Sequence, residues 1–277
     1  MPDHDELAAA VARGAAAPAD RARLLRYMDL NLWEMYRAMA RAADGGEIRE
    51  TRALTMLAVP GSMVWNNLVL VRDAIEADEL VREVRDFYVR RGLPFGIYTR
   101  AHADADLEQA LVARAFAVLV GNPGMVLLRD PGTACAPAGL AVRAATDERG
   151  RDAFRHVTGE AYATYDQPRD LADHLFATLA SVCAPTVQGF VGWVGDEPVA
   201  AAALYLTHGV AGVGEVGTVP AHRGRRYAEA VTWAVVREGF RRGAAFVNLQ
   251  ASPMGEAVYA RMGFTTPTAY HVLVRKA

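Results

Sequence analysis

The stretch Thr218-Val219-Pro220-Ala221-His222-Arg223-Gly224-Arg225-Arg226-Tyr227-Ala228 joins a predicted strand to a predicted helix. Residues 210–219 are rich in valine and spaced by glycine, which indicates a strand. Downstream, apolar residues recur every three or four positions as far as Gly243, which is typical of a helix. The basic turn therefore lies at a helix N-terminus, where unpaired backbone N–H groups and the helix dipole favour an anion. We expect it to bind a polyphosphate.

This spacing resembles motif A of the GNAT superfamily of acyl-CoA N-acyltransferases, Val-x-Pro-x-x-[Arg/Gln]-x-x-Gly-x-[Gly/Ala]. Pro220, Arg223 and Ala228 match the motif, and Thr218 takes the place of its valine. Arg226 stands where the motif has its central glycine. A side chain there either crowds a pyrophosphate or points outward and pairs with a phosphate, and we favour the second. For this motif alone, a solvated basic turn is the alternative.

A second motif follows a short β-rich run at 245–250. Residues 252–264 resemble motif B of the same superfamily, Asn-x-x-Ala-x-x-x-Tyr-x-x-x-Gly-Phe. Ser252 takes the asparagine place, Gly255 the alanine place and Tyr259 the tyrosine place. Two motifs in the family's order favour an acyl-CoA site over a plain basic turn.

Length and composition suit a globular, two-domain protein. The chain has 277 residues, of which 52% are hydrophobic and 22% charged, enough for two domains of about 140 residues with buried cores. The formal net charge of −2 gives no general basic field. We therefore expect neither nucleic acid nor an anionic membrane surface as a partner.

The cysteines and the N-terminal residues indicate the compartment. Cys135 and Cys183 have no metal-ligand or CxxC spacing, so we expect reduced, structural cysteines and no metal. Residues 1–6 are acidic and lack the apolar core of a signal peptide. No stretch approaches the ~18 apolar residues of a membrane span. These features predict a cytoplasmic protein.

The first half of the chain reads as alternating strands and helices after a weakly structured lead-in at 7–18. The patterns predict helices over 21–43, 77–91 and 105–116, and extended segments over 47–59, 64–71, 94–99 and 125–129, with a breaker at 60–62. The methionine and aromatic stripe of the first helix is expected to be core.

The second half begins after a Pro/Gly-rich linker at 131–139. We predict strands over 140–143, 188–194 and 199–206, helices over 147–163 and 169–184, and a turn at 195–198. Together with the strand at 210–219, this is the β-α-α-β-β-β order that opens a GNAT domain.

The two halves repeat each other. Arg90-Arg91-Gly92 mirrors Arg241-Arg242-Gly243 at an offset of 151 (241 − 90), and each tripeptide precedes a predicted strand. At this offset, residues 72–77 lie opposite 223–228, but they lack glycine and carry two carboxylates that would repel phosphate. Aligning Phe116 with Phe264 puts Leu111 opposite Tyr259, so the first half has no tyrosine at the position of Tyr259.

The fold class predicted from this repeat is α/β (α+β), with two GNAT-like domains, each a mixed, mostly antiparallel sheet flanked by helices. Residues 1–138 would form a degenerate domain without a cofactor site, which packs against its partner and helps to wall the acceptor pocket. Residues 139–277 would form the catalytic domain.

The resemblance implies acetyl-CoA as co-substrate and assigns the residues that hold it. Backbone groups of Val216, Gly217, Thr218 and Val219 would grip the pantetheine and the thioester carbonyl, with a backbone N–H facing the oxyanion. The phosphates would contact Arg223, Gly224, Arg225, Arg226, Tyr227 and Ala228. Ser252 would hydrogen-bond the pantetheine, or would only cap its helix.

The resemblance also assigns Tyr259 as the general acid that protonates the coenzyme thiolate, with a core tyrosine as the alternative. Glu215 is our candidate general base. The family's glutamate lies nearer Gly212, so strand alternation turns Glu215 to the opposite face unless a β-bulge restores it. Catalytic base and solvated sheet edge stay equally open. His208 and His222 are alternative proton relays, and residues 160–166 are a candidate acceptor wall.

Three functions fit these observations to different degrees. The first is an N-acetyltransferase that moves an acetyl group directly from acetyl-CoA to a small-molecule or peptide primary amine in a ternary complex. The second is a catalytically silent acyl-CoA sensor. A scaffold or dimerisation module is the third, and it explains neither motif. The acceptor stays open, as does the choice between monomer and homodimer.

Overall fold

The computed structural model describes residues 4–14, 17–60, 64–130, 132, 136–165, 167 and 169–276. Its helices are α1 His4–Ala12, α2 Pro18–Ala42, α3 Ala77–Phe87, α4 Ala105–Val112, α5 Glu148–Tyr162, α6 Arg169–Leu175, α7 Tyr227–Arg241 and α8 Glu256–Arg261. Its strands are β1 Glu47–Glu50, β2 Leu54–Ala58, β3 Asn67–Val71, β4 Gly96–Arg100, β5 Phe116–Leu127, β6 Leu140–Ala144, β7 Cys183–Ala184, β8 Val187–Val194, β9 Glu197–Thr207, β10 Val210–Thr218, β11 Val247–Gln250 and β12 Thr265–Arg275.

These strands form one mixed sheet in the order β1-β2-β3-β4-β12-β5-β11-β10-β9-β8-β6, with β7 paired to β8. Two neighbouring pairs are parallel, β3 with β4 and β10 with β11, and the others are antiparallel. A helix connects each parallel pair, α3 in the first half and α7 in the second, as a parallel crossover requires. The predicted fold class of two similar, mostly antiparallel α/β units is confirmed.

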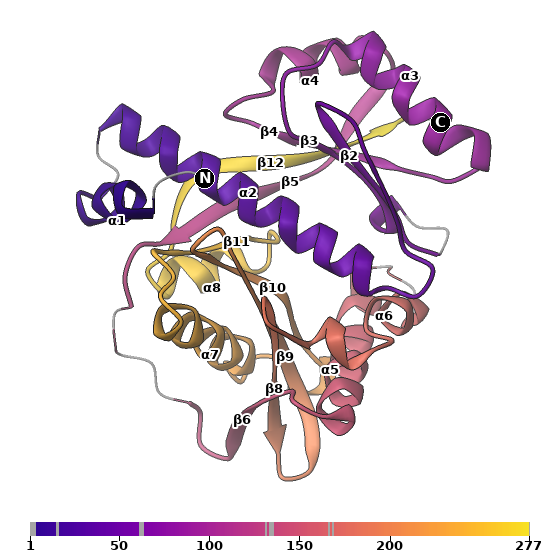
Figure 1. Ribbon diagram of the computed structural model, residues 1–277. Coiled ribbons are helices and arrows are strands. Elements are labelled where there is room, and N and C mark those ends of the chain that lie inside the picture. Colours follow the sequence, from indigo (N-terminus) through magenta and orange to yellow (C-terminus); the bar gives the residue numbers. More distant parts are fainter. Residues whose placement is uncertain are drawn as a thin grey trace.

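The two units exchange their last strands. β5 follows α4 of the first unit, yet it pairs with β11 of the second, from Val247↔Leu127 to Gln250↔Gly124. β12 follows α8 of the second unit and pairs with β4 of the first, from Tyr270↔Arg100 to Leu273↔Ile97. In Figure 1 the yellow β12 runs beside β4 and ends in the lobe that carries α3 and α4. A cut after residue 138 would therefore separate strands that pair.

Helix α2 lies between the two units and packs against β9 and β10 of the second (Figure 1). Its buried Asn31 donates hydrogen bonds from Nδ2 to the carbonyls of Tyr205 (2.9 Å) and Val210 (3.1 Å). Asn248 of β11 donates in turn to Asn31 Oδ1 at 3.0 Å. Because buried amides are costly to leave unpaired, this network fixes α2 against the sheet of the second unit.

The N-terminal residues are more ordered than the sequence pattern predicts. Residues 7–18 are not a weakly structured lead-in, because α1 spans His4–Ala12 and a new helix, α2, starts at Pro18. Leu7 is fully buried and packs in a cluster with Leu24 and Phe246. The alanine-rich segment is helical because this remote apolar surface covers it.

Several predicted elements are shorter in the structure than in the sequence patterns. The helix predicted over 105–116 ends at Val112, and the segment 125–129 is the end of β5, which begins at Phe116. The helix predicted over 169–184 ends at Leu175, and residues 183–184 pair with β8. The run 47–59 divides into β1 and β2. Residues 265–275, for which the patterns predict no element, form β12, since pairing with β4 and β5 decides their structure.

The remaining predicted elements agree with the structure within a few residues. They include α2, α5, α7 and the strands β6, β8, β9, β10 and β11. Residues 61 and 62 of the breaker and residues 131 and 133–135 of the linker, Cys135 among them, lie outside the described residues.

Candidate active site

Strand β10 leaves its parallel neighbour β11 halfway along. The two pair only from Ala211↔Val247 to Val213↔Leu249, whereas β10 continues to Thr218. On its other edge, β10 stays paired with β9 as far as Thr218↔Ala200. The backbone edge of Val216, Gly217 and Thr218 that faces β11 is therefore available to a ligand.

A β-bulge interrupts β10 at the point where the strands part. Its register against β9 shifts between Gly214 and Gly217, and Glu215 within the bulge has φ +54°. A non-glycine residue in this region is strained and is common at functional sites. The bulge is the feature that allows Glu215 to leave the ordinary alternation of the strand.

The basic turn leads directly into α7, as the sequence predicts. Gly224 and Arg226 both have positive φ, +76° and +62°, and Arg226 is the N-cap residue of α7. The N–H groups of Tyr227, Ala228 and Glu229 lack intrahelical partners because they belong to the first turn of the helix. The side chain of the N-cap residue, Arg226, makes no hydrogen bond to them. This end of α7 presents partial positive charge to the space in front of it.

The three arginines of the turn differ in their contacts. Arg223 reaches back to the end of α5, where Nη2 donates to the Ala161 carbonyl (3.1 Å) and to Thr164 Oγ1 (2.8 Å). Arg226 points outward, with 72% of its side chain exposed, and pairs with Glu229 at 2.5 Å. The exposed Arg225 does not line the cavity described below.

Helix α8 brings Tyr259 to the same space. Tyr259 is 8% exposed and packs edge-on against Phe264 at 6.0 Å between ring centroids. Ser252 precedes the helix, and its Oγ accepts a hydrogen bond from Gly255 N at 3.2 Å. The helix predicted from Ser252 thus begins only at Glu256, with Ser252 stabilising the turn before it.

These segments enclose a cavity of about 330 Å³. Ten residues predicted for the site line it: Val216, Gly217, Thr218, Arg223, Gly224, Arg226, Tyr227, Ala228, Ser252 and Tyr259. Val219, Arg225 and Glu215 do not. The other lining residues are Ala161, Tyr162, His222, Glu229, Met254, Gly255, Val258 and Arg261. Sequence reasoning does not single out Glu229, Met254 or Arg261, because neither motif names them.

Glu215 lies one residue beyond the cavity wall. Its residue surface is partly accessible, but its carboxyl is desolvated, and this burial raises the pKa from 4.5 to about 7. Its carboxylate lies near enough to Tyr205 of β9 and Tyr36 of α2 to raise the pKa of both phenols. Burial raises the pKa of Tyr205 well above its ordinary value, and the Glu215 carboxylate adds to that rise. Tyr36 belongs to the stripe that the sequence indicates as core, so the sequence does not reveal its place beside Glu215.

Of the remaining candidates from the sequence, some line the cavity and others do not. His222 lines the cavity, stacks on Tyr227, and its Nε2 lies 3.2 Å from Glu197 Oε1. His208 lies in the turn between β9 and β10, at the other end of β10 from Thr218. In the candidate acceptor wall, Tyr162 lines the cavity and Glu160 pairs with Arg169. Asp166 lies outside the described residues.

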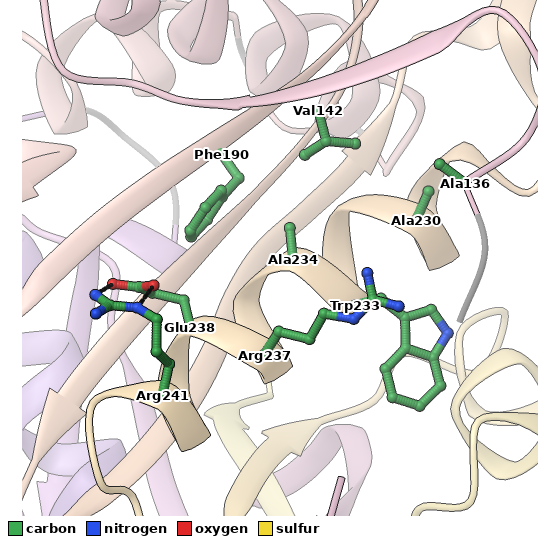
Figure 2. Close-up of a pocket in the computed structure, with 9 residues that line it drawn as sticks. All are labelled: Ala136, Val142, Phe190, Ala230, Trp233, Ala234, Arg237, Glu238 and Arg241. Atoms are coloured by element: carbon green, nitrogen blue, oxygen red, sulfur yellow. Dashed lines mark hydrogen bonds and ion pairs between the residues drawn. The ribbon is translucent and has the colours of Figure 1, made fainter. Parts of the chain in front are cut away.

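A larger cavity, about 570 Å³, lies on the other side of α7, against β6 and β8 (Figure 2). Phe190, Val142 and Trp233 give it an apolar wall, and Glu238 and Arg241 form an ion pair at 2.7 Å beside it. It contains neither the start of α7 nor any residue predicted for the site. We therefore take the smaller cavity as the candidate active site.

The part of the chain that the structure describes contains no group of three or more His, Cys, Asp or Glu side chains arranged to hold a metal ion. Over the same residues, no helix has the length and hydropathy needed to cross a membrane. Cys183 is a free cysteine.

Comparison with known proteins finds a family model that matches part of the chain. A family model described as the acetyltransferase (GNAT) family matches residues 151–264, which include the turn before α7 and the helix with Tyr259. No curated protein matches the chain in sequence. The C-terminal part of the chain, over residues 151–264, is therefore similar to the GNAT family.

Solved structures with this fold cover most of the chain. A GCN5-related N-acetyltransferase from Kribbella flavida is similar with a TM-score of 0.66 at 17% identity, over 87% of this chain and 93% of its own. One from Sphaerobacter thermophilus gives 0.54 at 16%, over 80% of each chain. A tandem GNAT protein from the clavulanic acid biosynthesis pathway gives 0.58 at 14%, over 84% and 83%. At these identities the likeness shows the fold alone.

Proposed function

We propose that this chain transfers an acetyl group from acetyl-CoA directly to a primary amine. One observation carries the proposal: a single cavity joins the uncapped start of α7, the β10 edge beyond its pairing with β11, and Tyr259, and Glu215 is the residue before Val216 in its wall. Each of these features answers one requirement of acyl transfer from a thioester. The similarity of residues 151–264 to the GNAT family supports the general reaction, and the residue roles are our inference.

The cavity fits a coenzyme with a polyphosphate and a thioester arm. The N–H groups of Tyr227, Ala228 and Glu229 face an anion favourably. Along β10, Thr218 Oγ1 is buried without a hydrogen-bond partner among the described residues, and it lines the cavity. An orphaned buried hydroxyl is costly, so a ligand group that pairs with it would be stabilised. Acetyl-CoA supplies the reactive thioester when bound.

Two side chains would move the protons. Glu215, with a pKa of about 7, takes a proton from the incoming ammonium near neutral pH. As the N–C bond forms, a β10 backbone N–H stabilises the charge on the carbonyl oxygen. The nitrogen, now positively charged, releases its second proton to solvent as the C–S bond breaks. Tyr259 then gives its phenolic proton to the departing thiolate. Exchange with solvent afterwards reprotonates Tyr259 and deprotonates Glu215.

We further propose that the first unit, residues 1–138, holds no second coenzyme. Its equivalent helix α3 has Glu76 at the N-cap and Asp78 and Glu79 in its first turn, which repel phosphate. Calorimetric titration of the full chain with acetyl-CoA should then give one site per chain. A stoichiometry of two would contradict this proposal.

The alternative function is an acyl-CoA sensor without turnover. Two observations favour it. The guanidinium of Arg223 binds the end of α5, and the guanidinium of Arg226 pairs with Glu229. Both arginines of the turn that line the cavity are therefore already bound to protein groups. Both functions predict coenzyme binding, so binding does not separate them.

Thiol release from acetyl-CoA with a panel of primary amines tests the proposal. Tyr259→Phe should lower kcat about tenfold to a thousandfold with little change in acetyl-CoA affinity, since only the transition state loses a donor. Tyr27→Phe, in the separate cluster with Phe246, is the matched control and should behave as wild type. If the wild type binds acetyl-CoA but releases no thiol with any amine, the chain is a sensor.

A further inference from the structure

Aromatic side chains from both units lie near the β10 bulge that carries Glu215, and the proposed transfer gives them no role. Tyr36 comes from α2, Tyr98 from β4 and Tyr205 from β9. The rings of Tyr36 and Tyr98 lie 5.5 Å apart between centroids. Tyr205 is 1% exposed, and its hydroxyl has no hydrogen-bond partner among the described residues. An orphaned buried phenol in such a place points to a polar group that arrives with a ligand.

Tyr36, Tyr98 and Tyr205 do not line the active-site cavity, and Tyr162 is the side chain that connects the cluster with it. Tyr162 lines the cavity, and its hydroxyl donates to the Val216 carbonyl at 3.4 Å. It also lies close enough to Tyr36 to influence that phenol, whose pKa burial raises, with Tyr98, Glu215 and Tyr162 adding to the rise. A path of neighbouring side chains therefore leads from the β10 edge to Tyr36.

The polar groups of this cluster are the Glu215 carboxylate, the phenols and, beside Tyr98, the Asn122 amide. The ring of Tyr205 and the sulfur of Met35 both press on Gly214, where a β-carbon would lie 2.9 Å and 3.1 Å from them. Burial is the cause of the raised Glu215 pKa, and no charged side chain of the described residues adds to it. Arg37, which follows Tyr36, is directed to Glu50 at 2.5 Å.

We infer that the acceptor is a primary amine with one positive charge and an apolar or aromatic body, held between Tyr36 of α2 and Glu215 of β10. This inference rests on the proposed acetyl transfer and names its acceptor class. Glu215 pairs with the ammonium group, and the tyrosine rings contact the cation and the carbon chain. A second ammonium would be desolvated among these rings without a partner, which is strongly unfavourable.

Two amines of the same length test the inference. n-Pentylamine and 1,4-diaminobutane differ only in a terminal methyl against a terminal ammonium group. We expect kcat/KM for pentylamine to exceed that for diaminobutane by about tenfold to a hundredfold, from the cost of a buried unpaired charge. Equal or faster turnover of diaminobutane overturns the inference and leaves the acetyltransferase function standing. Thiol release with neither these nor any other amine removes both.

Removing the ring of Tyr36 tests the part played by the first unit. Tyr36→Leu should raise KM for pentylamine about tenfold, the loss of one cation–π and packing contact, while acetyl-CoA affinity stays the same. Tyr27→Leu removes a ring from the same helix in the separate cluster, so it reports any general weakening of α2. An unchanged KM in Tyr36→Leu contradicts the placement of the acceptor. If Tyr36→Leu does not fold, the amine pair on the wild type decides.

Discussion

A β-carbon added to Gly212 would clash with the side-chain oxygen of Asn31, because the two atoms would lie much closer than van der Waals distance. Asn31 belongs to α2 of the first unit, and Gly212 lies on β10 of the second, near the place of the family's glutamate. A side chain at Gly212 is thus excluded by the helix that packs there. Glu215, in the bulge farther along β10, is the acid that remains on the strand.

Gly212→Ala should therefore destabilise the protein. The new methyl group must displace an amide that holds the Tyr205 and Val210 carbonyls, which costs about 1–3 kcal/mol in the free energy of unfolding. Gly159→Ala in α5 is the control, because its β-carbon would meet Ala172 at an ordinary 3.6 Å. It should be neutral or stabilising by up to about 1 kcal/mol. Equal melting temperatures for the two variants would contradict the contact.

The sequence predicts the parts of the site that depend on local chain geometry. The turn before α7 and the helix with Tyr259 are each built from a few consecutive residues, so their spacing identifies them. Tyr36 lies on a different unit, and its place beside Glu215 depends on how α2 packs. The local pattern of α2 shows only an apolar stripe, which is why it indicates core and not a site.

The same distinction explains the fold. The β-α-β units around α3 and α7 follow from local periodicity and can be predicted. The exchange of β5 and β12 depends on pairs far apart in sequence, such as Thr265↔Val126, and no local pattern encodes it. The sequence offers a β-bulge at Glu215 as one alternative, and β10 has it, but the positive φ of Glu215 is beyond the sequence, since a glutamate rarely adopts that conformation.

Glu215 as general base predicts the pH dependence of turnover. A base must be ionised, so kcat/KM for the amine should rise with pH through about 7, the pKa of Glu215, and then level off. Glu215→Gln should lose this inflection and about 10²–10⁴-fold in rate. An inflection near pH 7 that persists in Glu215→Gln would assign the base to another group, with His222 in the cavity wall as the next candidate.

The same carboxyl predicts how stability changes with pH. The pKa of Glu215 is higher in the folded state, about 7, than its ordinary value of 4.5. The folded chain therefore binds more protons over this window, and its stability falls as pH rises from about 4.5 to 7. The loss is at most about 3 kcal/mol, at ~1.4 kcal/mol per pKa unit. In thermal denaturation, the stability of Glu215→Gln should fall less than that of wild type between pH 4.5 and 7. An identical fall in both proteins would show that Glu215 is not the cause.

Gly224→Asp should weaken acetyl-CoA binding. Gly224 lines the cavity at φ +76°, and a β-carbon added there would meet nothing within 4 Å, so the carboxylate fits but repels phosphate. We expect the Kd to rise about tenfold to a hundredfold, the loss of about one charge-assisted contact. Gly92→Asp has a similar φ of +68° and open surroundings in the first unit, so it controls for backbone strain. Calorimetry that finds the two variants equal would move the phosphates away from the turn.

Arg226 stands in the family's glycine position and adopts the left-handed conformation, φ +62°, that glycine adopts without strain. Arg226→Gly should therefore keep or slightly raise the melting temperature, by about 2 °C.

The same substitution also removes a partner of Glu229, which lines the cavity and whose pKa the Arg226 hydrogen bond lowers. We expect acetyl-CoA to bind about tenfold more weakly, since the Glu229 carboxylate then faces the phosphates without its principal partner. The double variant Arg226→Gly/Glu229→Gln separates two roles of the arginine. Recovered affinity shows that Arg226 neutralises Glu229, and a Kd that stays high shows that its guanidinium contacts phosphate itself. If Arg226→Gly alone binds acetyl-CoA as tightly as wild type, the arginine takes no part in coenzyme binding.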